Sequence, residues 1–70
     1  MNFKIGALVT LNSGGLEMEI IHFILEPQNI YPICLCRWDT RDGTYYSVFD
    51  IRMLTLIFTV PSDEMPAGEL

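Results

Sequence analysis

Basic residues are scarce in this chain. Four of its 70 residues are lysine or arginine, against nine aspartates and glutamates, which gives a formal net charge of −5. A surface that binds phosphate groups without regard to base sequence needs clustered lysines and arginines. The composition therefore argues against non-specific binding of nucleic acid. Residues 61–70 carry three acidic residues and no basic one, so much of the charge belongs to this final segment.

Residues that support metal or nucleophilic chemistry are also few. The chain has one histidine, His22, and two cysteines, Cys34 and Cys36, whereas a zinc site takes about four ligands of these kinds. His22 stands between isoleucine and phenylalanine, and the sequence places no nucleophile beside it. In a strand, the two cysteine Cα atoms would be about 6.5–7 Å apart, at the limit for a disulfide. We expect no catalytic, metal or cofactor site, and two buried thiols in a reducing compartment.

Long apolar runs are missing as well. The longest, residues 20–25 and 54–60, are far below the roughly 20 residues of a membrane-spanning helix. The apolar start at residues 5–11 is short and leads into Asn-Ser-Gly-Gly, without the small-residue cleavage pattern of a signal peptide. The sequence therefore predicts a soluble, cytoplasmic protein without a membrane segment.

Apolar residues, by contrast, are abundant. They make up 50% of the chain, and the mean hydropathy is +0.30. A chain of this length forms one domain, and it buries little more apolar surface than is needed to offset its conformational entropy. The surplus of apolar residues predicts a surface that is covered by a second copy or by a partner.

The arrangement of apolar residues predicts an all-β domain. Segments rich in β-branched and aromatic residues alternate with turn sequences, and none has the period of a helix. The expected strands are residues 7–11, 17–25, 33–38, 44–49 and 54–58 or 54–60. Alternation is lost near Ile21, which predicts a bulge or bend in the second strand. Asp42-Gly43 predicts a hairpin turn, and residues 50–53 a turn of 3-10 helix.

Two further expectations concern the core and the overall architecture. The face of the third strand with Cys34, Cys36 and Trp38 should be buried, because the opposite face would bury Arg37. Five short strands with one 3-10 turn before the last are typical of a small SH3-like barrel. We assign residues 1–60 to this barrel. Residues 61–70 are acidic and contain proline, so we expect a disordered tail.

Four short elements follow one another between residues 3 and 57. They are Ser13-Gly14-Gly15 with Met18, Cys36-Arg37-Trp38, Asp42-Gly43, and Val48-Phe49. In this order the chain resembles the YodC-like family of small bacterial and phage proteins. It departs from that family at Ala7, Asn12, Leu16 and Asp50, where the family has Asp, Lys, Pro and Pro. The resemblance implies an SH3-like barrel of bacterial or mobile-element origin and supplies no catalytic residues.

Aromatic and arginine side chains gather around the predicted loop at residues 26–32 and the central hairpin. Such side chains beside loops can bind a proline-rich peptide, a cation or a base. We predict a non-enzymatic module that binds an unidentified protein partner or a second copy of itself. The candidate binding residues are Tyr31, Arg37, Arg41, Tyr45 and Tyr46. The alternative is a nucleic-acid-binding barrel in which Arg37, Arg41 and Tyr45 contact backbone and bases.

Overall fold

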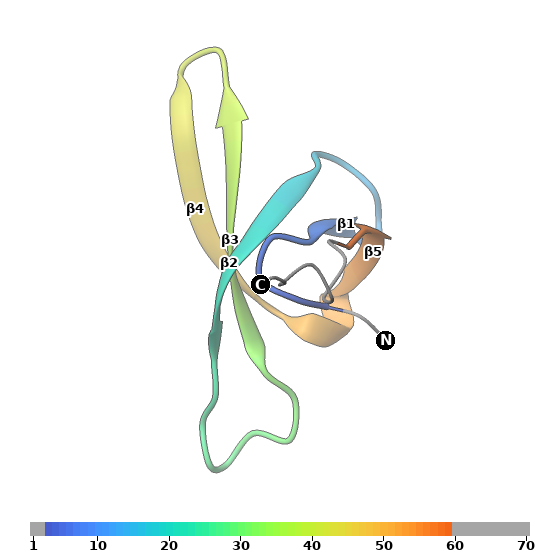
Figure 1. The fold of residues 1–70 in the computed structure, drawn as a ribbon, viewed down its shortest axis with the longest axis vertical. Helices are drawn as coiled ribbons and strands as arrows, with labels where there is room; N and C mark the ends of the chain where they lie inside the picture. The colour runs from blue at the N-terminus through green and yellow to red at the C-terminus, as the bar shows by residue number, and fades with distance from the viewer. Residues whose placement is uncertain (1–2, 60–70) are drawn as a thin grey trace, which may run out of the picture.

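A computed structural model describes residues 3–59, which form one five-stranded antiparallel sheet. The elements in chain order are β1 (Leu8–Leu11), β2 (Met18–Ile24), β3 (Ile33–Thr40), β4 (Gly43–Asp50), the 3-10 turn η1 (Ile51–Met53) and β5 (Leu54–Phe58). The strand order in the sheet is β4-β3-β2-β1-β5 (Figure 1). The last strand therefore returns to pair with the first. The all-β prediction is confirmed, and so is the single 3-10 turn before the last strand.

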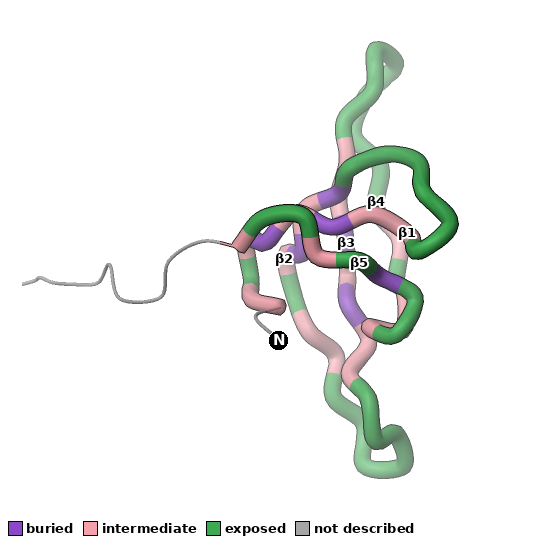
Figure 2. The backbone as a smooth tube through the Cα atoms, turned by 90° about the vertical axis from the view of Figure 1, so that its right-hand side faces the viewer, coloured by how far each residue is buried: buried purple, intermediate pink, exposed green. Residues whose placement is uncertain are grey.

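The sheet does not close on itself within residues 3–59. β4 and β5 are its two edges, whereas a barrel requires hydrogen bonds between its first and last strands. Instead, β1 and β5 lie over one side of the β3–β4 hairpin, with buried positions between them (Figure 2). The predicted domain boundary at residue 60 and the predicted tail at residues 61–70 lie outside the described residues.

The core lies between these two parts of the sheet. Its buried members are Ala7, Val9, Met18, Ile20, Cys34, Cys36 and Leu54. Both cysteines are fully buried with free thiols, while Trp38 packs at the margin of the core. Arg37 lies on the opposite side of β3, half-buried. The prediction that the cysteine face of this strand is buried is confirmed.

The predicted irregularity in the second strand is a β-bulge. The register between β2 and β3 shifts between Ile20 and His22, so Ile21 is the extra residue. Ile20 is fully buried opposite Cys36, whereas His22 is exposed opposite Leu35. The extra residue thus lets β2 follow β3 although its apolar alternation is broken.

The β3–β4 hairpin is longer at its turn than the sequence predicts, by two residues in β3 and one in β4. Only Arg41 and Asp42 remain in the turn, because Thr40 pairs with Gly43. The Thr40 hydroxyl accepts a hydrogen bond from the Asp42 N–H (3.0 Å) and donates one to the Gly43 carbonyl (3.3 Å). The hairpin tip lies at one end of the molecule, and the loop between β2 and β3 lies at the other (Figure 1).

Candidate functional site

One side of β2, β3 and β4 faces away from the core; we call it the outer face. On β3 it carries Ile33, Leu35 and Arg37, which alternate with the buried cysteines. Strand register aligns these three with neighbours on both sides, since residues in register share a face of the sheet. The aligned rows are Glu19–Arg37–Tyr46, His22–Leu35–Val48 and Ile24–Ile33–Asp50.

The centre of the outer face is apolar. Tyr46 is 58% exposed and Val48 51% exposed, and Leu35 lies half-buried between β2 and β4. Ile33 and Ile24, also half-buried, continue the apolar surface toward the loop end of the sheet. No element among residues 3–59 covers this face, because β1 and β5 lie on the core side (Figure 2). An uncovered group of large apolar side chains of this kind is typical of an interaction surface.

An ion pair borders the apolar centre. The Arg37 guanidinium donates a hydrogen bond to Glu19 Oε1 across the β2–β3 register, and both side chains remain partly exposed. A pair exposed to this extent adds only about 0–1 kcal/mol to stability. Its main effect is to hold Arg37 in one place beside Tyr46, its register partner on β4.

Tyr45 and Tyr46 point to opposite sides of the sheet. Tyr45 stacks on Trp38, with ring centroids 6.0 Å apart and an angle of 26° between the ring planes. This pair lies on the side of the hairpin that carries the core residues, as Trp38 shares a face with the buried cysteines. Tyr45 therefore supports the outer part of the hairpin, while Tyr46 contributes to the outer face.

The loop between β2 and β3 has a separate cluster. The Arg52 guanidinium lies over the Tyr31 ring, 4.3 Å from its centroid, and forms an ion pair with Asp50 at 2.8 Å. Asp50 Oδ1 also accepts a hydrogen bond from the Arg52 N–H at the start of η1 (2.8 Å). These hydrogen bonds from Arg52 lower the pKa of the Asp50 carboxyl to about 2. The same contact raises the pKa of Arg52.

Two hollows flank the contact between Tyr31 and Arg52. The larger, with a volume of about 370 Å³, is mostly apolar and is lined by Phe3, Tyr31, Ile51, Arg52 and Leu54. The other, of about 240 Å³, lies on the side of the loop and is lined by Gln28, Asn29, Ile30, Tyr31, Asp50 and Arg52. Because Arg52 is already held by Asp50, its charge is partly neutralised in both hollows.

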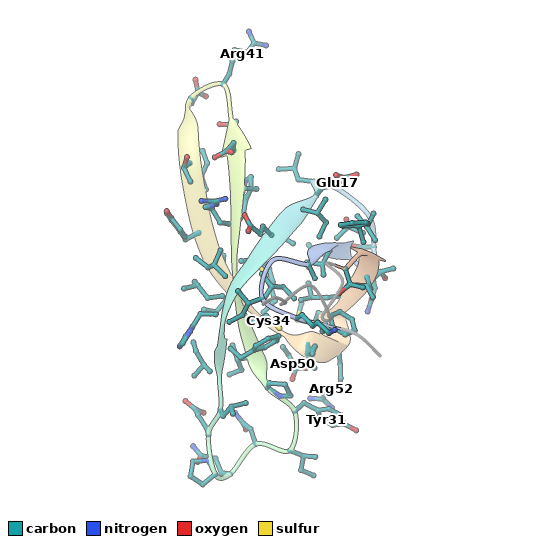
Figure 3. All side chains as sticks on the ribbon, viewed as in Figure 1. Glu17, Tyr31, Cys34, Arg41, Asp50 and Arg52 are labelled. Carbon is teal, nitrogen blue, oxygen red and sulfur yellow. The ribbon has the colours of Figure 1, made fainter. Side chains whose placement is uncertain are left out.

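The structure separates the five residues predicted to bind a partner. Arg37 and Tyr46 are neighbours on the outer face, whereas Tyr45 faces the other side. Arg41 lies at the hairpin tip and Tyr31 at the opposite end of the molecule (Figure 3). The loop and the hairpin tip therefore do not form one site.

Leu35 and Val48, at the centre of the outer face, are not among the residues that the sequence predicts to bind a partner. Their signal is cross-strand register, since only pairing aligns Leu35 with Val48. Alternation alone shows that β3 is apolar on both sides near Leu35, without showing which side remains uncovered.

The three residues predicted to bind nucleic acid are also dispersed. Arg37 lies on the outer face, Arg41 at the hairpin tip, and Tyr45 on the opposite side against Trp38. Binding of a single strand usually combines a continuous basic groove with aromatic side chains on the same surface. These positions do not share such a groove.

The buried thiols are held in their protonated form. Burial raises the pKa of the Cys36 thiol to about 11, and the nearby Cys34 adds to this rise. Burial also raises the pKa of Cys34. A thiol that stays protonated at neutral pH is a poor nucleophile and a poor metal ligand. Across the described residues, no three or more histidine, cysteine or acidic side chains form a group that could hold a metal ion.

Comparisons of the chain with models of known protein families, with curated proteins and with solved structures gave no match. The resemblance to the YodC-like family therefore stays a prediction. Over the described part of the chain, no helix has the length and apolar character needed to span a membrane.

Proposed function

We propose that this protein is a non-enzymatic interaction module that binds another protein through its outer face. The observation that carries the proposal is the uncovered apolar centre formed by Leu35, Val48 and Tyr46. Burying apolar area contributes about 25 cal/mol per Å². A partner that covers this centre would therefore gain binding free energy from surface that the fold itself leaves in water.

The rim of the outer face supports the same proposal. Protein interfaces combine an apolar centre with a polar rim and are enriched in tyrosine and arginine. Here Arg37 and Glu19 supply the polar rim, and their ion pair holds Arg37 in place before a partner arrives. Less side-chain entropy is then lost on binding.

An SH3-like architecture is part of this proposal. It is supported by the five-stranded antiparallel order, by the return of β5 to β1 and by η1 just before β5. The sheet itself is open within residues 3–59, so the proposal concerns the SH3-like strand order; membership of the YodC-like family belongs to the same proposal. Small β domains of this kind commonly bind ligands on exposed strands and loops.

A capture experiment with matched variants tests the proposed surface. The tagged chain is used as bait, and captured proteins, including an untagged copy of itself, are compared for wild type, Leu35→Lys and Ile30→Lys. Both variants add one positive charge, but Leu35 lies in the centre of the outer face and Ile30 lies in the β2–β3 loop, 89% exposed. We expect Leu35→Lys to lose the captured protein and Ile30→Lys to retain it.

Circular dichroism shows whether each variant is folded before capture is compared. The proposal is wrong if wild type retains no protein, its own copy included, or if Leu35→Lys retains the same proteins as wild type. If only Ile30→Lys loses the captured protein, the binding surface lies on the loop and the assignment to the outer face is wrong.

A further inference from the structure

Among residues 3–59, β4 is an edge of the sheet with a free row of backbone groups. The N–H of Ile51, just beyond β4, donates a hydrogen bond to the Pro32 carbonyl (3.1 Å). In an antiparallel pair, hydrogen-bonded and non-hydrogen-bonded pairs alternate. Because Ile51 is in a hydrogen-bonded pair, every second residue before it, which means each odd-numbered residue of β4, also hydrogen-bonds to β3. Thr44, Tyr46 and Val48 therefore direct their N–H and C=O groups away from the sheet.

This edge lacks the features that normally prevent edge-to-edge pairing. Natural edge strands are shortened, bulged, covered, or interrupted by charged residues or proline. β4 has eight residues, pairs with β3 without a register shift, and has no charged residue or proline from Gly43 to Phe49. The other edge, β5, has five residues, and its register with β1 shifts between Leu8 and Val9.

We infer that the β4 edge binds a second copy of this chain by antiparallel pairing of the two β4 strands about Tyr46. This contact goes beyond the proposed function, because it uses the edge beside the outer face and leaves Leu35, on β3, free for a partner. The two copies would form one continuous sheet, in which the outer faces lie on the same side. Like the interfaces of most two-fold dimers, this one uses the same surface patch of both copies.

Strand β4 is complementary to itself in this register. Tyr46 lies opposite Tyr46 of the second copy, and Thr44 lies opposite Val48 of the second copy. These positions are the ones with outward backbone groups, so each pair can exchange two hydrogen bonds. The side-chain pairs, aromatic with aromatic and β-branched with β-branched, are stabilising combinations across antiparallel strands.

Charge limits the pairing to this uncharged stretch. If the same pairing continued beyond Thr44 and Val48, the next hydrogen-bonded pair would be Asp42 of one copy and Asp50 of the other. Like charges directly opposite each other are destabilising. Each chain has a net charge of −5. The uncharged residues from Thr44 to Val48 therefore form the contact, and the pairing ends before these carboxylates at each side.

Sedimentation equilibrium with two substitutions of Tyr46 tests the contact. Wild type is expected to reach twice the 8.0 kDa mass of the chain as concentration rises. Tyr46→Pro removes an outward N–H that has no partner within the sheet, and proline is tolerated on an edge strand of this kind. Tyr46→Thr removes the same ring but keeps the N–H. We expect proline to weaken dimerisation by at least about tenfold relative to threonine.

Cross-linking through an introduced cysteine tests the register and does not depend on the proline variant being folded. Cα atoms of a hydrogen-bonded pair are about 5.5 Å apart, within the range that a disulfide can bridge. With oxidised glutathione, Tyr46→Cys should form a covalent dimer, and Thr44→Cys, which faces Val48 of the second copy, should not. The native cysteines do not interfere, because both are fully buried.

The outcomes separate this inference from the proposed function. A chain that remains monomeric, or a dimer in which Tyr46→Pro behaves as Tyr46→Thr and Tyr46→Cys does not cross-link, overturns the β4 contact. If that dimer dissociates with Leu35→Lys, the outer face is still a binding surface and only the edge assignment fails. Assemblies that grow beyond a dimer also overturn it, since they indicate pairing of β4 with a different edge.

Discussion

Asp50 links three parts of the molecule. It ends β4, it caps η1 by accepting a hydrogen bond from the Arg52 N–H, and it forms an ion pair with the Arg52 side chain. Arg52 in turn lies over Tyr31 in the β2–β3 loop. A single carboxylate thus positions the start of η1 and, through Arg52, one residue of the loop. Its ionisation should therefore affect stability.

We predict that Asp50 stabilises the fold at neutral pH and that this contribution is lost in acid. Its pKa falls from an ordinary value of 3.8 to about 2 in the folded chain. A group with a lowered folded pKa contributes stability that is present above its unfolded pKa and lost as the pH falls through the folded pKa. Wild type should exceed Asp50→Asn in denaturant midpoint near pH 6, and the difference should close between about pH 4 and pH 2.

Asp42→Asn is the control for this change in charge. Asp42 lies in the hairpin turn, and its side chain has no hydrogen-bond partner within residues 3–59. Its substitution should leave the pH dependence of the midpoint as in wild type. Equal pH profiles for Asp50→Asn and wild type would contradict the role assigned to the contact between Asp50 and Arg52.

The core should respond to the loss of a single methyl group. Ile20 is fully buried, and isoleucine-to-valine substitutions at buried positions cost about 0.5–1.5 kcal/mol. In a domain this small, that is a large part of the total stability. Ile30→Val is the matched control, because Ile30 is 89% exposed and should change the free energy of unfolding by less than about 0.5 kcal/mol. Equal losses in urea denaturation would mean that Ile20 is not in the core.

At the scale of elements, Asn12 connects the turn after β1 to η1 and β5 by hydrogen bonds. Its side-chain Nδ2 donates a hydrogen bond to the Arg52 carbonyl (2.7 Å), and its Oδ1 accepts one from the Thr55 hydroxyl (2.7 Å). Its backbone N–H donates to the Met53 carbonyl (2.8 Å). The two side-chain bonds connect positions 40 and 43 residues apart in the chain. They help to hold β5 on β1.

Asn12→Ala should therefore destabilise the domain by about 1 kcal/mol, since each net hydrogen bond contributes roughly 0.5–1.5 kcal/mol and exposed ones lie at the low end. Faster amide hydrogen exchange in β5 would show where the loss occurs. The control is Asn29→Ala, because within residues 3–59 the Asn29 side chain bonds only to Glu26, in its own loop (3.0 Å). A larger loss for Asn29→Ala than for Asn12→Ala would show that Asn12 does not fasten β5.

The strands themselves could be predicted from sequence, because alternation and turn residues are local signals. The broken alternation near Ile21 also marks the bulge correctly. The sequence predicts hairpin strands that end too early, because the turn depends on hydrogen bonds of the Thr40 side chain, which composition does not reveal. The open edge at β4 is a property of strand order and has no local signature.

The candidate site was predictable only in part. Residue type alone selects Arg37 and Tyr46, yet their adjacency depends on the pairing of β3 with β4. Residue type also selects Tyr45, although consecutive strand residues point to opposite faces of a sheet. The long-range neighbours of Leu35 could not be found without that same register.

At the scale of the whole molecule, the apolar surplus lies on both sides of the sheet. Within the described residues 3–59, β1 and β5 cover the core side, while no strand covers the outer face or pairs with the β4 edge (Figure 2). A small domain can afford few core residues, so apolar residues beyond that number must lie at the surface. A protein that covers the outer face would place these residues in an interface, and this accounts for a composition that is 50% apolar.

The charge distribution predicts that the protein does not bind single-stranded DNA. The net charge is −5, and Arg37 and Arg52 are each paired with a carboxylate. Phosphate binding needs clustered free cations that displace counterions. The fluorescence anisotropy of a labelled strand should therefore stay unchanged at low salt, where electrostatic binding is strongest.

Glu19→Gln sharpens this test, because it removes the ion-pair partner of Arg37 and lowers the negative charge by one. One freed arginine does not create the continuous basic groove that strand binding requires. The anisotropy of the labelled strand should therefore also stay unchanged with this variant. An increase for wild type that disappears as salt is added would contradict the prediction and favour the nucleic-acid alternative. An increase for Glu19→Gln alone would mean that the pairing of Arg37 with Glu19, rather than the dispersal of the cations, prevents binding.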